Sequence, residues 1–151
     1  YPDVITKFNG IFLGENYDGL ILQETWAPRN GLLERLAVHY TLAIFTGRPA
    51  DDLNHTLRRF APAVQFAPVI TMESVTRHKP DPQGLLRIME QHPDVPLTYV
   101  GDTVDDARAA AAARVPFIGV SPKPATAARL RETGAIAVID DINAIEGVLN
   151  A

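Results

Sequence analysis

Continuous apolar runs alternate with helix-forming stretches from residue 41 to the end of the chain, and this alternation restricts the fold more than any other feature. The runs are apolar throughout rather than at every second position, which is typical of strands buried on both faces of a parallel sheet. The strands predicted in this way are residues 41–46, 67–71, 97–102, 116–120 and 135–140.

Helices are predicted between these strands and before the first of them, at residues 30–39, 51–60, 82–91, 104–114, 125–133 and 142–149. A strand–helix–strand order implies right-handed crossovers, because parallel neighbours in one sheet are almost always joined in that hand. The pattern therefore predicts the α/β class, with a parallel sheet between two layers of helices in a three-layer, Rossmann-like arrangement.

The first 26 residues do not continue this pattern. Two apolar runs lie on either side of a turn rich in Gly, Asn and Asp, in the stretch IFLGENYDGLIL. This stretch can form a hairpin or two helix ends joined by a linker, and we expect it to lie outside the sheet. The predicted division is a linker region at residues 1–26 and an α/β core at residues 27–151.

Composition excludes several kinds of protein. A net charge of −4 without a basic cluster argues against nucleic acid or an anionic membrane surface as the main partner. No apolar run reaches the roughly 18–20 residues that span a bilayer. The absence of Cys excludes disulfides, thiolate metal sites and a Cys nucleophile. The chain begins without a basic, apolar leader, so we expect a cytoplasmic protein.

Polar side chains follow three of the predicted strands, where an open parallel sheet binds its ligands. Thr46 follows the first strand, Lys79 lies in the loop after the second, and Asp102 ends the third. Asp106 lies one helical turn beyond Asp102, so both carboxylates can face the same opening. Paired carboxylates suit Mg²⁺, and the set as a whole suits a phosphate group.

Each of these signals also has a purely structural interpretation. Asp102 or Thr103 can cap the helix that follows, with Asp106 in its positive first turn. Thr46 can belong to an ordinary turn at the end of a strand, and Lys79 can be a solvated side chain before a helix start. The order of the three segments, rather than any one of them, favours a phosphate and metal site.

Arg48 and Gly47 complete the first of these segments. Gly47 lets the backbone approach a ligand closely, because it has no side chain. Arg48 can hold an anionic group of a substrate, or it can pair with Asp51 or Asp52 on the following helix.

In this order, the segments resemble the haloacid dehalogenase superfamily of phosphatases, and in particular its phosphoglycolate-phosphatase-like branch. IFTGRP matches the second motif of that family, HKPDP the third, and YVGDTVDDARAAAAA the fourth. The resemblance covers roughly residues 27–151. It implies the α/β core of that family, with residues 1–26 as the end of a small helical cap.

The resemblance also implies a role for each residue that matches a motif. Thr46 would bind the phosphoryl group, with Gly47 and Arg48 beside it in the same loop. Lys79 would orient the nucleophile and offset its charge. Asp102 would ligate Mg²⁺, and Asp106 would do so directly or through water.

Two departures from the family pattern stand out. The smaller is Arg114, which occupies the position where the family usually has the Gly that ends the Ala-rich helix; we expect this helix to end differently. The larger is the absence of the first motif, an Asp-x-Asp at the end of an apolar strand.

In the family that strand is central, between the strands that end at Thr46 and Asp102. The chain also begins without Met, so we expect an upstream segment to supply the strand, the nucleophile Asp, the general acid/base Asp and the start of the cap. A chain without this segment is expected to be inactive by itself.

The function predicted from the sequence is a Mg²⁺-dependent phosphomonoester hydrolase that works through an aspartyl-phosphate on a small phosphorylated metabolite. One alternative is a haloacid dehalogenase-type hydrolase, which needs no metal. Another is a catalytically inactive module that binds a phosphorylated ligand or a protein partner. A receiver-type or nucleotide-binding domain ranks last, because no Gly-rich phosphate loop is present. Association with an N-terminal fragment of the same protein, or with further copies of the chain, is also open.

Overall fold

The computed structural model describes Lys7 and residues 9–150. Each of the five predicted strands is present, although each is shorter than the apolar run that contains it. They are β1 (Ile44–Phe45), β2 (Val69–Ile70), β3 (Tyr99–Gly101), β4 (Phe117–Val120) and β5 (Ala137–Ile139). Every strand pair in the described residues is parallel, so the predicted α/β class with parallel sheets is confirmed.

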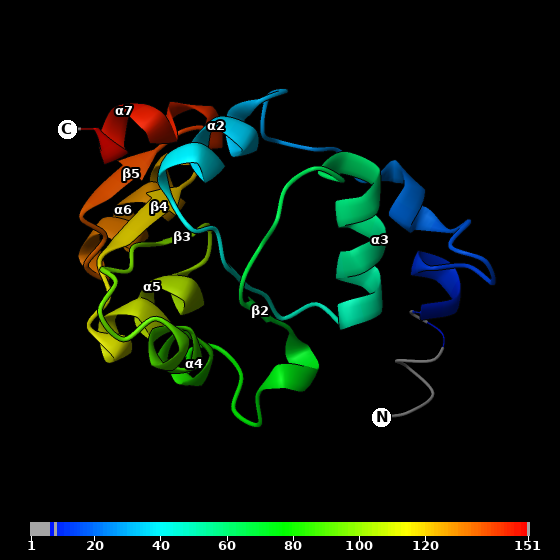
Figure 1. The fold of residues 1–151 in the computed structure, drawn as a ribbon, viewed down its shortest axis with the longest axis horizontal. Helices are drawn as coiled ribbons and strands as arrows, with labels where there is room; N and C mark the ends of the chain where they lie inside the picture. The colour runs from blue at the N-terminus through cyan, green and yellow to red at the C-terminus, as the bar shows by residue number, and fades with distance from the viewer. Residues whose placement is uncertain (1–6, 8, 151) are drawn as a thin grey trace.

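The predicted helices are also present, with ends that differ by no more than three residues (Figure 1). They are α2 (Leu32–His39), α3 (Ala50–Phe60), α4 (Gln83–Gln91), α5 (Val104–Ala113), α6 (Pro124–Glu132) and α7 (Ile145–Leu149). Two short 3₁₀ turns, η2 (Met72–Ser74) and η3 (Ile142–Ala144), lie after β2 and before α7.

The core has two apolar clusters, one on each side of the strands. Phe117 packs with the cluster that contains Leu85 of α4 and the buried alanines of α5. Ile118, the next residue along β4, packs with the cluster that contains Leu32 of α2 and Ile145 of α7. Because successive strand residues point to opposite faces, these contacts confirm the helix–sheet–helix layering. The four buried alanines of α5 let this helix lie close to the strands (Ala107, Ala109, Ala110 and Ala113).

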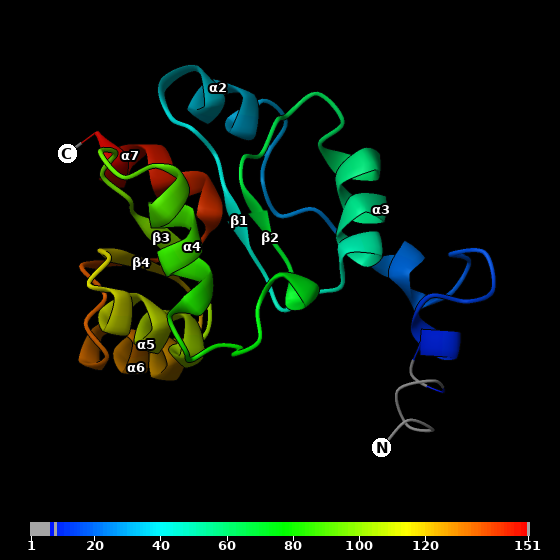
Figure 2. The same cartoon turned by 60° about the horizontal axis from the view of Figure 1, so that its bottom comes forward.

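The strands form two separate sheets, β1–β2 and β3–β4–β5, and β1 does not pair with β3 in the described residues. The Ile44 amide donates to the Pro68 carbonyl on the β2 side, so the amide and carbonyl of Phe45 face the other way. By the same alternation, the Tyr99 amide donates to Pro116 on the β4 side, and the backbone groups of Val100 face away from β4. Figure 2 shows β1 and β2 between α3 on one side and the β3–β5 sheet on the other. Within the described residues, β1 and β3 therefore each have one edge that pairs with no strand.

The N-terminal segment, defined here as residues 9–26, contains no strand. Residues 9–12 are helical and a 3₁₀ turn, η1 (Leu20–Gln23), precedes the linker to α2. Of the two sequence interpretations, helix ends joined by a linker are therefore confirmed and the hairpin is wrong. Figures 1 and 2 show the segment beside α3, outside both sheets. The predictions for residues 1–6, 8 and 151 lie outside the described residues.

The end of α5 differs from expectation. Arg114 adopts the left-handed conformation, with φ of 58°, and its amide donates to the carbonyls of Ala110 and Ala111. The helix thus ends with the same backbone geometry that a Gly would allow, and the expectation of a different ending is wrong. The tertiary connection from α5 to β4 imposes this conformation on a residue that disfavours it.

No helix in the described part of the chain has both the length and the apolar character needed to cross a membrane.

Candidate functional site

The loop after β1 holds Thr46 and Gly47 at the carboxyl end of that strand. The Thr46 amide donates to the Ile70 carbonyl at 2.9 Å, which ties the start of the loop to β2. The Thr46 hydroxyl oxygen accepts from the Arg48 amide at 3.1 Å, so its own proton is free to point outward. Apart from Gly47 and its two chain neighbours, no atom of the described residues lies within 4 Å of the place where a Cβ at Gly47 would be. The backbone at Gly47 is therefore open to an approaching ligand.

Lys79 and Asp106 form the shortest ion pair of the site. The Lys79 Nζ lies 2.6 Å from Oδ1 of Asp106, and the two side chains are 21% and 4% exposed. Lys79 reaches this position from the loop between η2 and α4, whereas Asp106 lies in the first turn of α5. The structure thus joins two of the residues that the sequence analysis selected.

Both oxygens of Asp106 are fully used by protein donors. Oδ1 accepts from Lys79 Nζ and from the Tyr99 hydroxyl at 2.7 Å, and Oδ2 accepts from the amide and the hydroxyl of Thr103 at 3.1 and 2.7 Å. A carboxylate offers about four lone-pair positions, so the protein itself occupies them all. Burial alone would raise the pKa of Asp106, but the hydrogen bonds from Lys79, Thr103 and Tyr99 outweigh burial and lower it.

Thr103 and Asp106 also form a reciprocal cap at the start of α5. The Asp106 amide donates to the Thr103 hydroxyl oxygen at 3.0 Å, and the Thr103 amide donates to Oδ2 of Asp106. The structural interpretation of this segment is therefore correct for Thr103 and Asp106. It does not compete with the ion pair, because the cap uses Oδ2 and Lys79 uses Oδ1.

Tyr99 was not selected from the sequence, yet it connects three parts of the site. Its hydroxyl lies 2.7 Å from Oδ1 of Asp106, 3.3 Å from Lys79 Nζ and 3.4 Å from the Phe45 carbonyl oxygen at the end of β1. Burial, followed by the nearby Asp106 charge, raises the pKa of Tyr99, so the phenol stays protonated. The strand period could have pointed to it, because residues 99 and 101 share the face that α5 covers.

Asp102 has the opposite environment to Asp106. Its side chain is exposed, and within the described residues it has no hydrogen bond or ion pair. The preceding Gly101 is required here, because a Cβ at that position would lie 2.8 Å from Cβ of Asp106. Gly101 thus lets α5 approach β3 closely, while the carboxylate of the next residue, Asp102, stays free of partners in the described residues.

The Arg48 side chain contacts the N-terminal segment and α3. Its Nη1 lies 3.1 Å from Oε1 of Glu24, and its Nη2 donates to the Thr56 hydroxyl at 3.0 Å. A longer contact of 3.4 Å joins Nη2 to the Asp52 carbonyl. Neither sequence interpretation of Arg48 included Glu24, because nothing local in the sequence relates these two residues.

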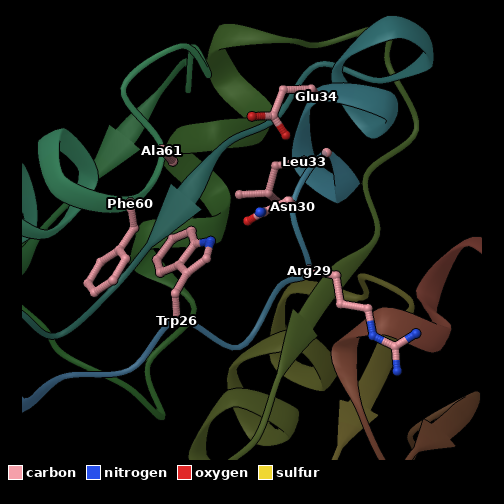
Figure 3. Close-up of a pocket in the computed structure, with 8 residues that line it drawn as sticks. Trp26, Arg29, Asn30, Leu33, Glu34, Phe60 and Ala61 are labelled. Atoms are coloured by element: carbon pink, nitrogen blue, oxygen red, sulfur yellow. The ribbon is translucent and has the colours of Figure 1, made fainter.

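A pocket of about 120 Å³ lies between the linker, the start of α2 and the end of α3 (Figure 3). Trp26 and Phe60 stack there with ring centroids 5.3 Å apart. None of the site residues selected from the sequence lines this pocket. No group of three or more His, Asp or Glu side chains with metal-site geometry occurs among the described residues.

Comparison with known proteins gives the family. The model of the haloacid dehalogenase-like hydrolase family matches residues 21–120, which is more than half of the chain. The chain belongs to this family. No curated protein matches the chain.

Solved structures of haloacid dehalogenase-like proteins resemble the chain. One is a haloacid dehalogenase-like hydrolase from Bacteroides fragilis, with 29% identity and a TM-score of 0.69 over 78% of this chain and 59% of that one. Another is a Thermotoga maritima protein named as a β-phosphoglucomutase, with 26% identity and a TM-score of 0.71 over 81% of this chain and 59% of that one.

A protein from Haemophilus somnus named as a phosphoglycolate phosphatase has 23% identity and a TM-score of 0.67, over 78% of this chain and 53% of that one. At this identity the likeness supports the fold alone. The chain spans between half and three fifths of the length of these three structures.

Proposed function

We propose that this haloacid dehalogenase-like chain is the larger part of a Mg²⁺-dependent phosphomonoester hydrolase that acts on a small phosphorylated metabolite through an aspartyl-phosphate. The observation that carries the proposal is the chain of contacts from the end of β1 through Tyr99 and Lys79 to Asp106. These contacts bring an ammonium group between the loop of Thr46 and the first turn of α5.

In this proposal Thr46 and Gly47 bind the phosphoryl oxygens through a hydroxyl and an open backbone amide. Lys79 contributes a positive charge that offsets the repulsion between a carboxylate nucleophile and a phosphate dianion. Phosphoryl transfer depends mainly on positioning and charge stabilisation, and these side chains can do both. Asp106, held by four donors, keeps Lys79 in place.

The residues present fit a Mg²⁺ ion, with unequal roles for the two acidic side chains. Asp102 would hold the ion, because its carboxylate is exposed and has no partner in the described residues. Asp106 would contribute through a water at most, since its oxygens already accept four hydrogen bonds. Mg²⁺ commonly takes one or two carboxylates with waters and phosphate oxygens, and would neutralise phosphate charge.

The nucleophile is proposed to lie on a strand that pairs with both β1 and β3. In the described residues no strand pairs with this edge of β1 or of β3, and the Phe45 carbonyl has only a long contact of 3.4 Å from the Tyr99 hydroxyl there. Backbone groups left unpaired cost roughly 1–3 kcal/mol each when they are buried. A parallel strand from an upstream segment would satisfy both edges and bring its carboxyl end to Lys79. In the same proposal residues 1–26 are the end of a cap and residues 27–151 the core.

The experiment is hydrolysis of an aryl phosphate by the chain together with the encoded segment that precedes it. Asp102→Asn should abolish Mg²⁺-dependent hydrolysis, because it removes the free carboxylate that would hold the ion. Asp105→Asn is the matched control, since Asp105 is exposed in the same turn and its ion pair is the one with Arg108 at 3.3 Å on the surface. Near-normal activity of Asp102→Asn would refute the metal assignment.

Two further outcomes would identify the alternatives. Metal-independent halide release from a small haloacid would indicate a dehalogenase. Phosphate binding without hydrolysis, together with the absence of an Asp-x-Asp strand upstream, would indicate an inactive binding module.

A further inference from the structure

The N-terminal segment contacts the C-terminal half of α3, from His55 to Phe60. The ring of Tyr17 stacks on His55 with centroids 4.6 Å apart. Arg59 donates to the carbonyls of Ile21 and Leu22 at 3.4 and 3.0 Å. His55 and Arg59 are one helical turn apart, so these contacts share a side of the helix. The segment is therefore held mainly by α3.

One contact of the segment reaches the candidate site as well as α3. Glu24, Arg48 and Thr56, here called the Arg48 cluster, come from the segment, the loop after β1 and α3. The Glu24 carboxylate uses both oxygens: Oε1 lies 3.1 Å from Arg48 Nη1, and Oε2 accepts from the Thr56 hydroxyl at 2.8 Å. Arg48 Nη2 donates to the same Thr56 hydroxyl oxygen, which closes a ring of three residues.

The cluster is more than a surface ion pair. The Arg48 and Glu24 side chains are 31% and 24% exposed, and Thr56 is buried. Partial burial reduces screening by salt, and the planar guanidinium can bind two partners at once, which a lysine cannot do in the same way.

The backbone of Arg48 belongs to the loop that holds Thr46. Its amide donates to the Thr46 hydroxyl oxygen at 3.1 Å, and its carbonyl accepts from the Met72 amide at 3.0 Å. The side chain of Arg48 is thus fixed by the N-terminal segment and its backbone by the loop. Arg48 therefore connects Glu24 to the Thr46–Gly47 loop by direct contacts.

We propose that Arg48 is a positioning residue that couples the N-terminal segment to the Thr46–Gly47 loop through Glu24, and does not bind substrate itself. The significance of this coupling for phosphate binding rests on the function proposed above. The coupling itself does not, because it is a property of the chain without substrate.

Hydrogen exchange measured by mass spectrometry tests the coupling on the full chain, with any encoded upstream segment retained. In Glu24→Gln, exchange should become on the order of fivefold faster in two peptides, residues 20–26 and residues 44–49, because the fraction of locally open molecules rises about fivefold for each kcal/mol of contact energy that is lost. Exchange in β4 should not change, which separates the effect from general destabilisation. Glu15→Gln is the matched control, an exposed carboxylate in the same segment.

Two further variants keep the test decisive if Glu24→Gln does not fold. Arg48→Lys keeps the charge but loses the two-partner geometry, so both peptides should again exchange faster. The double variant Glu24→Arg with Arg48→Glu should bring both peptides at least halfway back to the wild-type rate, a rescue that a purely steric role would not give.

Faster exchange confined to residues 20–26, with residues 44–49 within twofold of wild type, would overturn the proposal. Activity measurements separate this result from failure of the proposed function. Faster exchange in both peptides without hydrolysis would support the coupling and refute the proposed function. Hydrolysis without faster exchange in residues 44–49 would support the proposed function and refute the coupling.

Discussion

Replacement of Asp106 by asparagine removes the charge that Lys79 faces in a largely buried site. An asparagine has one acceptor oxygen and one NH₂ donor. With its oxygen towards Lys79 and Tyr99, its nitrogen would face the amide of Thr103, which is also a donor. Asp106→Asn therefore leaves a buried ammonium without its counterion and places two donors against each other.

Asp106→Asn should lower the free energy of unfolding by about 3 kcal/mol, which is the lower end of the range for loss of one partner from a buried ion pair. The lower end applies because the Lys79 side chain keeps 21% of its exposure and can recover some hydration. In a chain of this size, each kcal/mol of unfolding free energy that is lost lowers Tm by roughly 2–4 °C. Asp106→Asn should thus lower Tm by about 6–12 °C.

The pH dependence of this cost follows from the pKa of Asp106. The pKa in the folded protein lies below the usual value of 3.8. The stabilisation by the charged form is therefore complete above the unfolded pKa and is lost as pH falls through the folded pKa. The difference in stability between wild type and Asp106→Asn should be constant near neutral pH and shrink below about pH 4.

Denaturant unfolding at several pH values measures both effects, with Asp105→Asn as the control. Asp105 is exposed and its pair with Arg108 is on the surface, so its loss should cost less than about 0.5 kcal/mol. A cost below about 1 kcal/mol for Asp106→Asn, or a difference that grows below pH 4, would refute the argument that this buried pair is held as a charged unit.

Two other substitutions test how closely α5 packs against the strands and how it ends. Ala109→Leu should lower the free energy of unfolding by about 1–3 kcal/mol in denaturant unfolding, because Ala109 is fully buried and the packed core has no room for the added atoms. The exposed Ala112→Leu should be nearly neutral, and equal effects of the two substitutions would contradict the packing described for α5. Arg114→Gly should raise the unfolding free energy by up to about 1 kcal/mol, because Gly adopts the left-handed conformation at no steric cost; a loss of stability would mean that the Arg114 side chain contributes more than its backbone strain costs.

The sequence predicted the strands and helices well because each is defined by a local pattern. A continuous apolar run of five residues such as residues 116–120 is typical of a strand buried on both faces, and β4 forms there. The strands proved shorter than the runs, although backbone hydrogen bonds continue beyond β1 to Leu42 and Thr46. The N-terminal segment was ambiguous because its two apolar runs suit either a hairpin or helix ends.

Part of the candidate site could also be predicted from the sequence. Lys79 and Asp106 were selected from their places after the strands, and the structure joins them at 2.6 Å. The roles proposed for Thr46, Gly47, Asp102 and the Mg²⁺ ion stay predictions. Tyr99 was missed because a tyrosine within a strand resembles any other core aromatic.

Local periodicity in the chain is enough to determine the class of fold, the order of its elements and the residues that follow each strand, because these depend on neighbours within about one helical turn or one strand. Only the tertiary structure decided that Asp106 accepts from four donors, that Arg48 faces Glu24, and that Arg114 takes a left-handed conformation. Each of these depends on groups brought together by the packing of separate elements, whose positions no local pattern specifies.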